Sequence, residues 1–128
     1  MRDIMGIKNY EDLDIYKDSF KLATEIHDMT MKLPKYELFE EGSQIRKSSK
    51  SVVANIVEGF GRRRYKNEFI KFLTYAHASC DETKVHLNFF FQSGYIQKET
   101  FNEYINRYKE LSRKIHNFIG SVEKGHKT

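Results

Sequence analysis

The segment from Lys66 to Gln92 constrains the fold more than any other, because one mainly apolar set of residues recurs along it at alternating spacings of four and three. The set comprises Phe69, Leu73, Ala76, Cys80, Thr83, Leu87 and Phe90. Residues three and four apart share one face of an α-helix, so this spacing predicts a long amphipathic helix over 66–92. Its persistence over about three heptads is typical of helices that pack side by side in a bundle.

Similar spacing predicts three more helices. The first is expected over 12–33 and must end before Pro34, which cannot continue a helix. The second is expected over 40–59 after a short linker, and the last over 98–120, while the polar residues 121–128 are expected to form a frayed tail. The expected apolar face of the first helix comprises Leu13, Ile15, Tyr16, Phe20, Leu22, Ala23, Ile26, His27, Met29 and Leu33.

Four amphipathic helices with short connections and no strand pattern predict an all-α fold, an antiparallel up-down-up-down four-helix bundle. A chain of 128 residues is long enough for one hydrophobic core and short for two, so residues 1–128 are expected to form a single domain. One proline and seven glycines leave few interruptions, and 10 Phe and 8 Tyr supply large side chains for burial.

The cellular compartment follows from the cysteine count and from the distribution of apolar residues. A single cysteine, Cys80, excludes an intrachain disulfide and fits a reducing cytosol. Residues 1–9 contain no apolar run that resembles a signal peptide, and no apolar stretch approaches the roughly 20 residues that a membrane helix needs. We therefore expect a soluble, cytoplasmic protein with no membrane partner.

The second predicted helix has two unlike faces at about 100° per residue. One is apolar and is assigned to the core: Ile45, Val52, Val53, Ile56, Val57 and Phe60. The other carries mainly small polar side chains: Gln44, Ser48, Ser51, Asn55 and Glu58. This polar face either meets water or packs on a second subunit, because short side chains allow close approach. Surplus aromatic residues on the third helix favour the second interpretation, a homo-oligomer with this face as its subunit interface.

Positive charge is concentrated in residues 44–66. This segment contains seven cationic side chains and one acidic side chain, so its net charge is 7 − 1 = +6. The whole chain is +4, so the remainder carries 4 − 6 = −2. Such a patch predicts phosphate contacts with RNA or another nucleic acid, and Tyr65 could stack on an unpaired base. The predicted nucleic-acid residues are Arg46, Lys47, Lys50, Arg62, Arg63, Arg64, Tyr65 and Lys66.

Two other interpretations of this basic segment stay open. The turn could be a solvated loop in which Arg62 pairs with Glu58 one helical turn earlier. Alternatively, the basic face could dock an acidic protein, such as a polymerase-type partner, so that the chain acts as an interaction scaffold without touching nucleic acid. Glu58 is expected to have a structural role at the helix end in either case.

Catalytic and metal-binding patterns are weak. His77, Cys80 and Asp81 could share a helical face, but they make a poor ligand set and Cys80 lies in the apolar seam. The two Glu-x-x-His pairs that a di-iron bundle needs are not present, since the one such sequence, Glu123 to His126, lies in the polar tail. Gly59-Phe60-Gly61 follows a helix rather than a strand, so it is expected to end that helix rather than to cradle a phosphate. We expect no enzymatic activity, no catalytic residue, no metal and no cofactor.

Several segments together resemble a known family. They occur in the order Asp12 to Lys17, Leu33-Pro34, Gln44 to Lys47, Ser51 to Arg62, and Glu68 to Leu73, and the Ala54-Asn55-Ile56-x-Glu58-Gly59-x-Gly61-Arg62 core is the most specific. The chain resembles the four-helix-bundle proteins encoded in intervening sequences of bacterial 23S ribosomal RNA genes. That resemblance implies a bacterial, cytoplasmic bundle that assembles as a ring, commonly a homopentamer. It also implies similarity to the accessory protein of diversity-generating retroelements, a basic pentameric bundle that binds a reverse transcriptase and nucleic acid.

Overall fold

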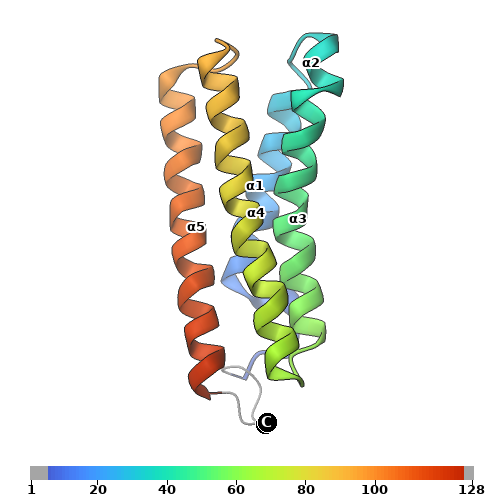
Figure 1. Ribbon diagram of the computed structural model, residues 1–128, viewed down its shortest axis with the longest axis vertical. Coiled ribbons are helices and arrows are strands. Elements are labelled where there is room, and N and C mark those ends of the chain that lie inside the picture. The colour runs from blue at the N-terminus through green and yellow to red at the C-terminus, as the bar shows by residue number, and fades with distance from the viewer. Residues whose placement is uncertain (1–5, 126–128) are drawn as a thin grey trace.

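The computed structural model describes residues 6–125, and every regular element within that range is helical (Figure 1). The long helices are α1 (Asp14–Thr30), α3 (Glu41–Gly61), α4 (Lys66–Gln92) and α5 (Lys98–Gly125). A short 3-10 turn (Tyr10–Asp12) precedes α1, and the five-residue α2 (Lys35–Phe39) lies between α1 and α3. The expected all-helical fold with four long helices is confirmed for these residues. No helix in the described part of the chain is long and apolar enough to cross a membrane.

Cross-helix contacts show how the long helices lie against one another. Side chains of α3 meet those of α4 in reverse chain order: Glu41 with His86, Ser48 with Thr83, and Ser51 with Ser79. Side chains of α1 and α5 do the same, as Asp18 contacts Lys114 and Glu25 contacts Arg107. Figure 1 shows the four long helices side by side, with the chain direction alternating from one to the next along the sequence.

The core lies along the common axis of these helices. All seven residues of the α4 seam predicted from the sequence are buried, which confirms that seam. Phe69 is central, because its ring makes edge-to-face contacts with Phe60 of α3 at 6.4 Å and with Phe118 of α5 at 5.8 Å between centroids. Burial of Cys80 in the same seam raises the pKa of its thiol to about 12.

The first helix differs from the prediction in its length and in one residue of the face it buries. It spans Asp14–Thr30 rather than 12–33, and Phe20, expected in the core, is 53% exposed. Ser19 is buried instead, with its hydroxyl donating to the carbonyl oxygen of Tyr16 at 3.0 Å. A serine that satisfies its hydroxyl within its own helix can occupy a core position without an unpaired polar group.

The C-terminal helix is longer than predicted. It continues to Gly125, so residues 121–125 are helical rather than part of a frayed tail, while 126–128 lie outside the described residues. Val122 explains the extension, because its side chain is fully buried in the core cluster. Burying one such side chain offsets part of the entropy of ordering the turn that carries it.

An ion pair between α1 and α5 predicts acid sensitivity. Arg107 donates to both carboxylate oxygens of Glu25 at 2.8 Å, and this hydrogen bonding lowers the pKa of Glu25 below its ordinary value. A lowered folded-state pKa contributes stability above the unfolded pKa of about 4.3 and loses it as pH falls through the folded value. Urea unfolding of the wild type and of Arg107→Met should therefore differ most near neutral pH and converge at acidic pH. A difference that stays constant with pH would contradict this role.

Candidate functional site

The basic turn between α3 and α4 is organised by Arg62. Its Nε lies 2.8 Å from Glu58 Oε2, its Nη1 lies 3.0 Å from Glu68 Oε1, and its guanidinium sits 4.9 Å from the centre of the Phe72 ring. The predicted pairing with Glu58 is thus present, and Glu58 has the structural contact expected at the helix end. Two carboxylates offset the charge of Arg62, so this arginine ties the turn to α3 and α4.

Arg63 also contacts the protein itself. Its Nη1 donates to the carbonyl oxygen of Phe60 at 3.0 Å, and its guanidinium lies 4.0 Å from the centre of the Phe60 ring. The last carbonyls of a helix lack partners within that helix, so a cation placed there stabilises the C-terminus of α3. Two of the three consecutive arginines therefore serve the local structure.

The next three residues face outward. Arg64 is exposed, Tyr65 is 60% exposed, and Lys66 is partly exposed at the first position of α4. The Arg64 guanidinium lies 5.8 Å from the centre of the Tyr65 ring, so a cation and an aromatic face are presented together. We call Arg64, Tyr65 and Lys66 the turn surface.

The remaining predicted cations do not form one patch with the turn surface. Arg46 points inward, where it donates to Thr30 Oγ1 at 2.9 Å and to the carbonyl oxygen of Leu38 at 2.8 Å. It holds α1, α2 and α3 together, which makes it a structural residue rather than an open phosphate contact. Lys47 and Lys50 are exposed, but Lys50 lies about 17 Å along α3 from the helix end at 1.5 Å per residue.

Part of the small polar face of α3 packs against α4 of the same chain. Ser48 is 1% exposed and accepts a hydrogen bond from Thr83 at 2.9 Å, so its assignment to a subunit interface is corrected. Ser51 and Ser79 hydroxyls lie 3.0 Å apart, and Asn55 donates to the carbonyl oxygen of Ser51. Gln44 and Glu58 are exposed, and their interface assignment stays a prediction. The sequence contained one indication of the contact between Ser48 and α4. Thr83 places a hydroxyl inside the α4 seam, and a buried hydroxyl requires a hydrogen-bond partner.

Short side chains on this face allow α3 and α4 to approach closely. A Cβ at Gly59 would lie 3.1 Å from the Phe72 Cβ, closer than ordinary contact allows. The glycine predicted to end the helix is therefore inside α3 and serves packing, while Gly61 is its last residue. Val53 and Val57, expected in the core, are only partly buried.

The structure has two exposed apolar surfaces that were not predicted from the sequence. The first, the α1–α3 groove, has a volume of about 370 Å³ and is lined by Phe20, Ala23, Thr24, His27, Lys50, Val53 and Ala54. The second, the α4 ridge, consists of Tyr75, Val85 and Phe89, which are 47%, 54% and 55% exposed. Phe91 of α4 instead stacks on Phe101 of α5 with 4.7 Å between ring centres.

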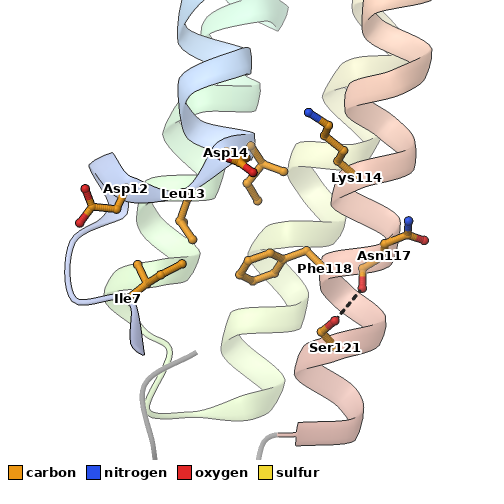
Figure 2. A pocket seen from close by; sticks show the side chains of 9 residues that line it. Ile7, Asp12, Leu13, Asp14, Lys114, Asn117, Phe118 and Ser121 are labelled. Carbon is orange, nitrogen blue, oxygen red and sulfur yellow. Dashed lines mark hydrogen bonds between the residues drawn. The ribbon is translucent and has the colours of Figure 1, made fainter. Parts of the chain in front are cut away.

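A cavity of about 350 Å³ lies where the segment before α1 meets α5 (Figure 2). Ile7, Leu13 and Phe118 supply its apolar wall, and Lys114 at its edge is paired with Asp18 at 2.8 Å. Ser121 donates to the carbonyl oxygen of Asn117, as the dashed line shows. Within residues 6–125 no cluster of three or more His, Cys, Asp or Glu side chains could hold a metal ion. The turn surface is therefore the strongest candidate site.

Comparisons with known proteins agree on the fold. A model of the family described as 23S rRNA-intervening sequence protein matches residues 11–117. The chain is also similar in structure to a protein of unknown function from the S23 ribosomal protein family of Bacteroides thetaiotaomicron. The TM-score is 0.76 at 24% sequence identity, and the match covers 83% of this chain and 95% of that one. The comparison with curated proteins gave no significant match.

Proposed function

Because the chain belongs to the 23S rRNA-intervening sequence protein family, we propose that it is a non-enzymatic, self-associating helical bundle that binds RNA or another nucleic acid through phosphate contacts. The observation that carries the proposal is the turn surface. It presents two cations and an aromatic ring at one end of the bundle, within a segment of net charge +6 in a chain whose remainder is −2.

Salt dependence measures these phosphate contacts. Each neutralised phosphate of a single strand contributes about 0.7 to the slope of log affinity against log salt concentration. Replacing Arg64 and Lys66 together with alanine should therefore flatten the slope for RNA by about 1.4. Replacing Lys98 and Lys109, which are exposed on α5, removes the same charge and should leave the slope unchanged. Equal slopes for the wild type and the turn variant would remove this surface from the proposal.

Self-association is supported by the two exposed apolar surfaces. The α4 ridge and the α1–α3 groove are different surfaces of one chain, so pairing ridge with groove is a heterologous contact, which closes into a ring when the rotation permits. Their charges are complementary, since Glu82 is exposed on the ridge itself, seven residues from both Tyr75 and Phe89, and Lys50 lines the groove. Rings of such chains would carry one turn surface per subunit, and repeated weak contacts raise the effective affinity for a long ligand.

The α1–α3 groove also supports a second candidate function, an interaction scaffold that docks a protein such as a polymerase-type partner. An apolar groove with one lysine, Lys50, in its lining fits an amphipathic acidic helix as well as a neighbouring copy. In this alternative a partner captured on the purified protein survives nuclease treatment, and Phe20→Glu abolishes its capture without changing any affinity for RNA.

A further inference from the structure

We propose that the turn surface binds unpaired nucleotides, with a base stacked on Tyr65 and the neighbouring phosphates on Arg64 and Lys66. The inference rests on the proposed nucleic-acid binding and specifies which form of nucleic acid is bound: single strands in preference to duplex. It concerns one end of the bundle, where α3 ends and α4 begins.

The three consecutive arginines have different roles, and only the third is presented to a ligand. Arg62 is held by Glu58 and Glu68, and Arg63 is held by the carbonyl and ring of Phe60. These contacts fix the backbone of the turn and leave the next three residues outward. The turn surface therefore presents a cation, an aromatic ring and a second cation in succession, on a backbone that the contacts of Arg62 and Arg63 hold in place.

The exposure of Tyr65 carries the second step. At this end Phe60 and Phe69 are 3% and 0% exposed and Phe72 is partly buried, whereas Tyr65 is 60% exposed. The Arg64 guanidinium lies over the Tyr65 ring, 5.8 Å from its centre, so a base can stack on the guanidinium plane or on the face of the ring that Arg64 does not cover. Stacking on an aromatic ring or on a guanidinium plane is how proteins take hold of splayed bases.

The size of the array selects single strands. Bases in a duplex are paired and stacked on one another, so their faces are closed to Tyr65, and a duplex could use only the charges of Arg64 and Lys66. Binding by charge alone needs many phosphate contacts to be tight. An unpaired nucleotide has an open base face and a phosphate on either side of its sugar, which matches the order of the three side chains.

The absence of Trp from the chain makes this testable by fluorescence. Tyr65→Trp introduces one indole at the turn surface, and an oligouridylate should quench its emission by stacking. A fully paired RNA with the same number of phosphates, and inorganic polyphosphate, should bind without comparable quenching. The same indole at Tyr36, which is 66% exposed on α2, should respond to none of them.

Affinity measurements give the decisive comparison. Tyr65→Leu should weaken binding of the oligouridylate roughly 5- to 150-fold, the range expected for loss of one base–aromatic stack, and leave duplex affinity unchanged. Tyr65→Phe should keep the wild-type affinity, and circular dichroism melting should show that each variant is folded.

The outcomes separate the two proposals. Tighter binding of single strands, lost in Tyr65→Leu and kept in Tyr65→Phe, supports the inference. Equal affinity for both RNA forms with no effect of Tyr65→Leu overturns the inference and leaves nucleic-acid binding standing. No binding to either RNA at low salt overturns the proposed function and the inference with it.

Discussion

Truncation of Phe69 to alanine is expected to destabilise the fold by about 3–5 kcal/mol. The side chain is 0% exposed and connects three helices, since its ring contacts Phe60 of α3 and Phe118 of α5 from its place in α4. Its removal loses the transfer free energy of the ring and leaves a cavity that the edge-to-face partners cannot fill without moving.

Chemical unfolding followed by circular dichroism measures this effect. The midpoint should fall at an unchanged slope, and the melting temperature should fall by roughly 10–20 °C for a chain of this size. Phe39→Ala is the matched control, because that phenylalanine is 66% exposed on α2 and its loss should cost about 0.5 kcal/mol or less. Similar losses for the two variants would mean that the core is not centred on Phe69.

Disruption of the ridge–groove contact is expected to convert the protein to a monomer. Phe89→Glu on the α4 ridge, or Phe20→Glu in the α1–α3 groove, places a charge in the middle of the proposed apolar contact, where it would be desolvated without a partner. Light scattering should give a multiple of 15.3 kDa for the wild type and 15.3 kDa for either variant at micromolar concentration.

A charge exchange tests whether these two surfaces meet each other. Glu82→Lys and Lys50→Glu should each weaken self-association, and the double variant should recover part of it, because the opposite charges are restored across the contact. Tyr36→Glu, at an exposed aromatic on α2, should have no effect on mass. A wild-type mass of 15.3 kDa would end the self-association proposal, and two weakened single variants without recovery would end the ridge–groove pairing.

Much of the bundle could be predicted because helical periodicity is a local property. The α4 seam, for instance, needs only its own spacing of three and four to identify its buried face, and all seven members are buried. The Arg62–Glu58 pair is likewise four residues apart within one segment, so a sequence argument could reach it.

The candidate site was predicted only in part. Eight residues were grouped by their proximity in sequence, but their side chains have different surroundings: Arg46 crosses to α1 and α2, and Arg63 turns back onto Phe60. The second ion pair of Arg62, with Glu68, and the contact of Arg63 with Phe60 depend on where α3 ends relative to α4. That placement reflects the packing of two helices and leaves no mark in the order of the residues.

By itself, the sequence determined the helical class, the single proline break, the buried seam of α4 and the family, since each depends on residue type and spacing along the chain. Only the tertiary structure decided that Ser48 faces Thr83, that Phe20 faces outward while Ser19 is buried, and that Arg64, Tyr65 and Lys66 form the open surface of the basic turn. The physical reason is the rotation of each helix about its own axis. The spacing of apolar residues identifies a broad arc of the helix that can be buried. Which residues at the edges of that arc are covered depends on the other segments of the chain that pack there.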